Sequence, residues 1–342
     1  MRADEWWEYK LVPILSIFYA TALVLHVAAI SLWIGALSLL LSIATAAIYA
    51  SAINELTDRA DDTAAGKRNR AADKPGSVAA LLVVAVGAGF TFAWLWRDDT
   101  RLLTCYLAIW LAFGLYSIPP FRLKKRGLPG VLCCAAGEQM FPALTAAFIA
   151  CRGAQRPVSG VWVASVAVLA LAFGLRGIVW HQLTDLENDR RACVQTFAAR
   201  HPRGAAILGT FIGFPLELIA LSGVLWQVAS VWPPLFLALY VLYAIYSARQ
   251  GNTRPVIVMP KPRFFLVLHQ FYSDLFPIAL LITATMRDRR NVIVLAVHLL
   301  LFPRQVVHAL QRIVYSMSKR RVSASTANTV VNASEPHHGG FG

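Results

Sequence analysis

Residues 36–62 read ALSLLLSIATAAIYASAINELTDRADD, an apolar segment that ends in a cluster of acids. The apolar part extends back to Leu11, and no Asp, Glu, Lys or Arg interrupts residues 11–53. A helix needs about 20 apolar residues to cross a bilayer core, so this run is long enough for two helices. We place the turn between them near Trp33–Gly35. The sequence therefore predicts a membrane protein whose second helix ends in acids at the membrane surface.

The composition of the whole chain supports a membrane protein over a soluble one. Of its 342 residues, 57% are hydrophobic and 15% charged, and the mean hydropathy is +0.56. Soluble domains carry about 45–50% apolar and about 25% charged residues. The net charge of +14 comes from basic residues in short loops between apolar runs, so we expect no nucleic-acid partner. The five cysteines form no C-x-x-C pair and predict neither a disulfide framework nor a zinc site.

Further apolar runs predict an all-α polytopic membrane protein with nine transmembrane helices. After the first two helices, the expected spans cover residues 78–96, 101–118, 130–151, 159–183, 205–228, 231–248 and 264–286. A shorter run from Val292 to Phe302 leads into Arg304, His308 and Arg312, which share one helix face. This last segment is either a tenth span or an interfacial helix. We expect one transmembrane domain over residues 1–317 and a disordered polar tail over residues 318–342.

The distribution of basic residues predicts the orientation. The loops after the second, fourth, sixth and eighth spans are rich in Lys and Arg, whereas most loops on the opposite side are poor in them. By the positive-inside rule, the N-terminus and the even-numbered loops face the cytoplasm. A bacterial inner membrane is the expected location, and membrane lipid is an expected partner.

Two acid rows lie at the cytoplasmic ends of even-numbered spans. Asn54, Asp58 and Asp62 are spaced four apart and therefore line one helix face. Asp185 and Asp189 form a second row at the end of the sixth span. Neighbouring carboxylates repel one another, and Mg²⁺ prefers such oxygen ligands and shares them with substrate phosphates. The acids would otherwise cap helix ends or pair with loop arginines, but two rows on one side favour a metal–diphosphate site.

A third motif lies between the acid rows, and together the three resemble a known family. The segment Tyr116-Ser-Ile-Pro-Pro-Phe-Arg-Leu-Lys124 is similar to a segment found after the fourth helix in many members of the UbiA superfamily of intramembrane prenyltransferases. Asn54-x3-Asp58-x3-Asp62 resembles the first aspartate-rich motif of that superfamily, and Asp185-x3-Asp189 resembles its second. The resemblance covers roughly residues 11–286. It implies nine helices in a ring around a central cavity.

The resemblance also implies a role for each site residue. The metal and diphosphate ligands would be Asn54, Asp58, Asp62, Asp185 and Asp189, of which the four aspartates are the expected catalytic residues. Tyr116, Arg122 and Lys124 would contact phosphate. Lys67, Arg70 and Lys74 match the basic loop of the family more loosely, and each of these loop cations otherwise serves topology alone. His181, one turn before Asp185, either orients that carboxylate, contacts substrate or is a buried core histidine.

The expected reaction is Mg²⁺-dependent transfer of a prenyl group from an allylic prenyl diphosphate to an aromatic or lipid-like acceptor. Two other reactions keep the same aspartates: cyclisation of the prenyl diphosphate, and phosphoribosyl transfer to a polyprenyl phosphate. An ion-coupled transporter is disfavoured, because its acids would lie near the midplane beside broken helices. The loop after the first motif reads Arg70-Ala-Ala-Asp-Lys74-Pro75 and lacks the Arg-Pro-Leu run of quinone-pathway members. The acceptor, the prenyl chain length and the oligomeric state stay open.

Polar residues inside other spans are candidates for binding the acceptor or transferring its proton. They are Glu138, Gln139, Glu217, His269, Gln270 and Asp274. Charged groups at this depth are costly and often functional. The alternative is an internal hydrogen bond or ion pair, for which Arg176 is a candidate partner.

Overall fold

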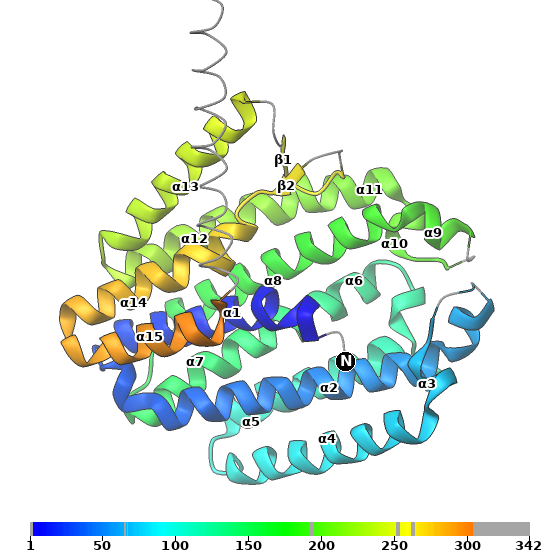
Figure 1. Ribbon diagram of the computed structural model, residues 1–342, viewed down its shortest axis with the longest axis horizontal. Helices are drawn as coiled ribbons and strands as arrows, with labels where there is room; N and C mark the ends of the chain where they lie inside the picture. Colours follow the sequence, from blue (N-terminus) through cyan, green and yellow to red (C-terminus); the bar gives the residue numbers. More distant parts are fainter. Residues whose placement is uncertain are drawn as a thin grey trace, which may run out of the picture. The chain divides into compact units, whose positions relative to one another are not determined.

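Helices make up most of the chain in the computed structural model (Figure 1). The structure describes residues 3–64, 66, 68–191, 194–250, 254–260 and 264–303. The chain divides into two units, Met1–Leu295 and Ala296–Gly342. The predicted boundary at residue 317 lies outside the described residues, as do Arg304, His308, Arg312 and the predicted tail.

The first unit holds the long helices. They are α1 (Ala3–Val24), α2 (Trp33–Ala64), α4 (Pro75–Leu95), α5 (Thr100–Ser117), α7 (Phe141–Ala154), α8 (Gly160–Thr184), α12 (Phe214–Val228), α13 (Trp232–Arg249) and α14 (Phe276–Arg287). Shorter helices are α3 (Arg70–Asp73), α6 (Leu128–Ala135), α9 (Leu186–Arg191), α10 (Phe197–Arg200) and α11 (Pro202–Ile207). Helix α15 (Val292–Leu301) is the last one described.

Single turns and one small sheet complete the described residues. The 3₁₀ turns are η1 (Ala29–Leu32), η2 (Leu123–Lys125) and η6 (Arg289–Asn291), and the π-helical turns are η3 (Ala136–Met140), η4 (Leu208–Gly213) and η5 (Phe271–Leu275). The strands β1 (Arg254–Val256) and β2 (Phe264–Leu266) pair in parallel.

Six helical segments in the described part of the chain are long and apolar enough to cross a membrane. They are Ala29–Thr63, Pro75–Leu95, Thr100–Ser117, Leu128–Ala154, Gly160–Thr184 and Pro202–Val228. These six correspond to the second through seventh predicted spans. The predicted polytopic all-helical architecture is therefore present, whereas the count of nine transmembrane helices is not confirmed.

Two predicted boundaries are wrong. The first turn lies at residues 25–28 rather than at Trp33–Gly35, because His26 adopts a left-handed conformation with φ of 55°. The span predicted at 264–286 does not begin as a helix. It begins as β2 and a turn at Leu268, whose φ is 64° and whose N–H donates to the hydroxyl of Tyr240 at 2.9 Å. The helical part starts only in the following residues.

Three helices contain a π-helical turn directly before a Phe-Pro pair. Proline has no N–H to donate to the carbonyl four residues earlier, so the helix widens upstream of it. In each case the Phe N–H instead donates to the carbonyl five residues back. The pairs are Phe141 to Ala136, Phe214 to Gly209 and Phe276 to Phe271. The sequence motif Phe-Pro thus marks each widened turn.

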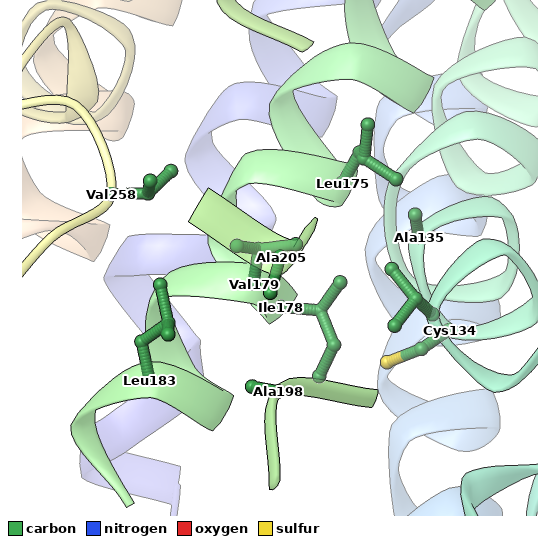
Figure 2. Close-up of a cluster of buried hydrophobic side chains, with 10 residues drawn as sticks. Cys134, Ala135, Leu175, Ile178, Val179, Leu183, Ala198, Ala205 and Val258 are labelled. Carbon is green, nitrogen blue, oxygen red and sulfur yellow. The ribbon is translucent and has the colours of Figure 1, made fainter. Parts of the chain in front are cut away.

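Helix α1 lies at the centre of the first unit, in contact with α7, α12 and α14 (Figure 1). Its residues Leu11, Val12 and Leu15 are each at most 2% exposed, so α1 is packed against protein on most sides. A second apolar cluster joins α8 to α6, α10 and α11 (Figure 2). Leu175, Ile178 and Val179 of α8 form its middle, and the partly buried Tyr116 packs against it. This cluster fixes the end of α8 that carries the second acid row.

Helix α4 packs against α2 and α5 through small residues and aromatic rings. A Cβ atom added at Gly89 would lie 2.3 Å from the indole ring of Trp110. That ring is held between Tyr49, with centroids 4.5 Å apart, and Tyr106, with centroids 6.0 Å apart. Gly87, half a turn away on α4, has nothing within 4 Å of an added Cβ.

We predict that Gly89→Ala destabilises the protein, because the methyl group displaces Trp110 from its packed position. Overpacking of this kind costs about 1–3 kcal/mol. Gly87→Ala is the matched control and is expected to leave stability unchanged or slightly raised. Thermal unfolding of the purified variants in one detergent checks both. Equal melting temperatures for the two variants would contradict the packing described for Trp110.

Candidate active site

The two predicted acid rows occupy the C-terminal ends of α2 and α8. In Figure 1 these two ends lie at the same side of the first unit, beside α3 and α9. Asn54, Asp58 and Asp62 all belong to the continuous helix α2. Asp185 ends α8, and α9 begins at the next residue, so Asp189 lies on a separate short helix. The Asp189 N–H donates to the Asp185 carbonyl at 2.8 Å, which keeps the two residues one turn apart.

The first row is neutralised by the basic segment that follows α5. One guanidinium nitrogen of Arg122 donates to Asp58 at 2.8 Å, to Asp61 at 2.9 Å and to the carbonyl of Thr57 at 2.8 Å. Lys124 also donates to Asp58, and Lys125 forms an ion pair with Asp61. Residues 58 and 61 and the segment 122–125 therefore form one charge cluster. The structure thus places Arg122 and Lys124 beside the first acid row, and their contact with phosphate stays a prediction.

Asp61 and Lys125 belong to this cluster but were not predicted as site residues. The sequence offered a signal for Asp61, which stands three residues after Asp58 and so lies on the neighbouring part of the same helix face. No comparable signal marked Lys125, since loop cations beside a membrane span usually reflect topology.

The backbone of the basic segment is held in an unusual conformation. Arg122 has φ of 39°, in the left-handed region that few non-glycine residues adopt. A Cβ atom at Gly130 of α6 would lie 2.2 Å from the carbonyl oxygen of Leu123, so only glycine lets the segment rest on α6. Burial lowers the pKa of the Lys124 ammonium below its usual range. The segment is thus pressed against the helices rather than extended into solvent.

Asp62 and Glu55 hold the next loop. Asn69 donates to Asp62 at 2.8 Å, and its side chain also accepts from the N–H of Ala72 to cap α3. The N–H of Arg70 donates to Glu55 at 2.7 Å. The structure places the predicted Arg70 and Lys74 around a surface pocket between α2 and α4, lined also by Glu55, and not among the contacts of Asp58. Lys67 lies outside the described residues.

The two carboxylates of the second row differ in solvent exposure. Asp185 is partly exposed and lies 3.6 Å from the imidazole of His181. Asp189 is buried and accepts a hydrogen bond from Thr196 at 2.9 Å, and Thr196 in turn caps α10. His181 is itself exposed on its helix, which excludes the buried core histidine considered from the sequence.

The oxygen donors fit Mg²⁺ in chemistry, although the described residues form no ready-made metal cage. No group of three or more His, Cys, Asp or Glu among them is close enough to hold an ion. Instead Asp58, Asp62 and Asp189 accept hydrogen bonds from protein groups, and Asn54 accepts a hydrogen bond from Ser117. Mg²⁺ typically binds one or two carboxylates and fills its remaining positions with water and substrate phosphates. The two acid rows match that kind of site.

Sequence and structural comparisons agree on the family. The sequence model of the UbiA prenyltransferase family matches residues 14–268. The chain belongs to the UbiA prenyltransferase family. No curated protein sequence matches the chain significantly.

Two solved structures of a UbiA homologue from Archaeoglobus fulgidus share the fold. The first has a TM-score of 0.50 and 18% sequence identity over 82% of this chain and 96% of the homologue. The second, bound to DMAPP and Mg²⁺, has a TM-score of 0.52 and 17% identity over 81% of this chain and 99% of the homologue. Membership of this intramembrane family, together with the six apolar helices, identifies the chain as a membrane protein.

Among the polar residues inside the spans of this UbiA protein, Glu217 forms an internal ion pair. Two guanidinium nitrogens of Arg176 donate to Glu217 at 2.7 and 2.9 Å, and both side chains are 0% exposed. Arg176 also donates to the carbonyl of Ile257 at 3.3 Å and so ties α8 and α12 to the segment after β1. The structure thus favours the ion-pair interpretation of Glu217 over an acceptor role.

Of the other interior candidates, Gln139 lines an apolar cavity. Pro13, Ile14 and Ile17 of α1, Gln139 of η3, Phe173 of α8 and Tyr272 of η5 contribute to its walls. His269 lies between the rings of Phe173 and Tyr9, with centroid distances of 6.0 and 5.6 Å. Glu138 forms an ion pair with Lys10 of α1. Gln270 and Asp274 also have partners in the structure.

We predict that Glu217→Gln strongly destabilises the protein, because it leaves the Arg176 charge buried without a counter-ion. Breaking a buried pair from one side costs about 3–5 kcal/mol. The double variant Arg176→Met, Glu217→Leu removes both charges and is expected to recover most of the lost stability. Thermal unfolding in detergent measures all three proteins.

The matched control is the exposed pair of Asp98 with Arg152, whose atoms are 2.9 Å apart. Asp98→Asn is expected to change the melting temperature little, because exposed ion pairs contribute little. If Glu217→Gln were as stable as Asp98→Asn, the buried pair would have no structural role.

Proposed function

We propose that this protein catalyses Mg²⁺-dependent transfer of a prenyl group from an allylic prenyl diphosphate to an aromatic or lipid-like acceptor within the membrane. The charge cluster of Asp58, Arg122 and Lys124 carries the proposal, because it gathers metal-binding oxygens and phosphate-binding cations at one point. Membership of the UbiA prenyltransferase family supports it. The Archaeoglobus fulgidus homologue with DMAPP and Mg²⁺ supports the donor and the ion.

In the proposed site, substrate binding exchanges the partners of the charge cluster. Arg122 and Lys124 now neutralise Asp58. With a diphosphate and Mg²⁺ bound, these cations would hold the phosphate oxygens and Asp58 would hold the ion. Arg suits phosphate because its planar donors can bind two oxygens at once. The cluster thus avoids unpaired charge both before and after binding.

The proposed ligands of the ion and the diphosphate are those expected from the sequence: Asn54, Asp58, Asp62, Asp185 and Asp189. Tyr116, His181, Lys67 and Arg70 are proposed substrate contacts beside Arg122 and Lys124. Asp62 and Asp189 would have to release Asn69 and Thr196 to reach the ion. Bound Mg²⁺ would supply charge neutralisation for the pyrophosphate leaving group. The protein contributes alignment and a surface from which water is excluded.

The apolar cavity is the proposed location of the prenyl tail. Phe173, which lines it, precedes Asp185 by twelve residues along α8. At about 1.5 Å per residue, this spacing places the cavity about 18 Å from the second acid row. A tail of several isoprene units can extend over that distance while its diphosphate stays at the rows. We propose that the rows face the cytoplasm of a bacterial inner membrane, in keeping with the basic loops beside them.

We predict that the purified protein in nanodiscs releases pyrophosphate from radiolabelled allylic prenyl diphosphates only with Mg²⁺. Asp58→Asn and Asp185→Asn should each lower the rate by about 10²-fold or more, the usual cost of removing one group that stabilises developing charge. Lys124→Met should weaken binding of the diphosphate. Asp98→Asn, on a different loop, is the control and should keep full activity.

Product analysis separates the related reactions. A prenylated acceptor supports transfer, whereas a cyclic hydrocarbon formed without acceptor would indicate a cyclase. If no prenyl diphosphate binds or reacts but phosphoribosyl diphosphate does, the proposal fails in favour of phosphoribosyl transfer.

A further inference from the structure

One carboxylate inside the spans belongs to neither acid row and yet remains accessible. Glu138 lies in the π-helical turn η3 and forms an ion pair with Lys10 of α1. The side chain of Glu138 is 26% exposed and that of Lys10 is 46% exposed. The Arg176–Glu217 pair, by contrast, is 0% exposed on both sides. Glu138 is therefore partly exposed, whereas Glu217 is fully enclosed.

Glu138 is connected to a proposed substrate contact of the diphosphate site. The thiol of Cys134 contacts its carboxylate at 3.6 Å. The partly buried Tyr116 packs against the apolar cluster that contains Cys134. These contacts through Cys134 and Tyr116 thus lead from Glu138 toward the proposed diphosphate site.

The same pair lies close in sequence to residues that line the apolar cavity. Lys10 precedes Pro13 and Ile14 by three and four residues, so all three share one face of α1. Glu138 is next to Gln139, which lines the cavity. Lys10 and Glu138 therefore lie at the level between the diphosphate-binding rows and the cavity that would hold the prenyl tail. We place the bond to be broken, between C1 of the prenyl group and the diphosphate oxygen, on this side of the cavity.

We propose that Glu138 is the base that accepts the proton of a hydroxyl-bearing acceptor, and that Lys10 is a positioning residue that holds Glu138 in place. This inference rests on the proposed prenyl transfer. The acceptor oxygen forms a bond to C1 of the prenyl group as the bond from C1 to the diphosphate oxygen breaks. Pyrophosphate leaves with that electron pair, and the hydroxyl proton passes to the Glu138 carboxylate. Atoms and electrons balance without any further reactant.

Other interior groups fit this role less well. Glu217 is enclosed and already accepts two bonds from Arg176. Asp58 and Asp185 lie at the rows and would face the diphosphate. His269 is enclosed by the rings of Tyr9 and Phe173. Glu138 combines accessibility, a carboxylate and the required depth.

The experiment follows transfer and donor consumption separately in the full-length protein in nanodiscs. The donor is radiolabelled geranylgeranyl diphosphate with Mg²⁺, and the acceptor probes are 1-naphthol, a phenol, and 1-decanol, an alcohol. We expect Glu138→Gln to lower kcat for probe prenylation by about 10²-fold, the usual contribution of a general base. Binding of the donor and its slow hydrolysis in the absence of probe should match those of the wild type.

Lys10 gives a second, independent test. As a positioning residue, Lys10→Met should lower kcat for prenylation without changing the KM for the donor, and Lys10→Arg should restore it. Asp98→Asn is the charge control. Melting temperatures identify any variant that fails to fold. If Glu138→Gln is unstable, Glu138→Asp replaces it, because Asp keeps the carboxylate. Glu138→Asp should retain more prenylation activity than Glu138→Ala.

Each outcome decides the matter. Unchanged prenylation by Glu138→Gln overturns the proposal and leaves prenyl transfer itself intact. Release of pyrophosphate by the wild type with no prenylation of either probe also overturns the hydroxyl acceptor. Parallel loss of donor binding and prenylation in Glu138→Gln would place Glu138 in the diphosphate site rather than at the acceptor. No reaction of any donor with the wild type would instead refute the proposed function.

Discussion

The cost of leaving a charge unpaired in an apolar environment governs this structure. An ionised side chain away from water is expensive unless an opposite charge or hydrogen bonds accompany it. The described interior accordingly pairs Arg176 with Glu217 and Lys10 with Glu138. At the membrane end of α2, Asp58 is satisfied by Arg122 and Lys124. These pairs determine which helices must pack together, because each one joins segments that are far apart in the sequence.

The same constraint explains why the acid rows and the basic segment occur together. Carboxylates arranged to bind a metal would repel one another while the ion is absent. The segment 122–125 supplies the missing positive charge from within the protein, and it needs Gly130 beneath it to approach closely. In the proposed function, a substrate that carries both Mg²⁺ and phosphate would offer new partners to the carboxylates and to the cations. The proposed site would then exchange charge partners instead of holding a bare ion permanently.

Features with a local chemical signature could be predicted from the sequence, whereas pairings at long range could not. The rows on α2 and α8 followed from a spacing of four residues, and six of the predicted spans followed from long, mostly apolar runs. The partner of Glu138 could not be inferred from the sequence. Lys10 lies 128 positions earlier, and its ammonium group meets the Glu138 carboxylate only when α1 packs against η3 in the folded protein. The turn at His26 was missed because a histidine, and not a glycine, adopts the left-handed backbone conformation there. Asp62 and Asp189 were expected as ligands, and their bonds to Asn69 and Thr196 depend on loops whose course no periodicity describes.

The three π-helical turns connect the pairing of interior charges to the position of the cavity. A proline after phenylalanine removes one helical hydrogen bond, and the helix responds by widening a turn earlier. Two of these turns, η3 and η5, contribute Gln139 and Tyr272 to the cavity wall, and η3 also carries Glu138. A regular α-helix would rotate the residues before Phe141 by part of a turn and would move Glu138 away from Lys10. Because the widened turn sets that rotation, the ion pair of Glu138 with Lys10 depends on the π-helical turn that precedes Pro142. The backbone irregularity thus sets the position of a charged side chain beside Gln139, which lines the cavity.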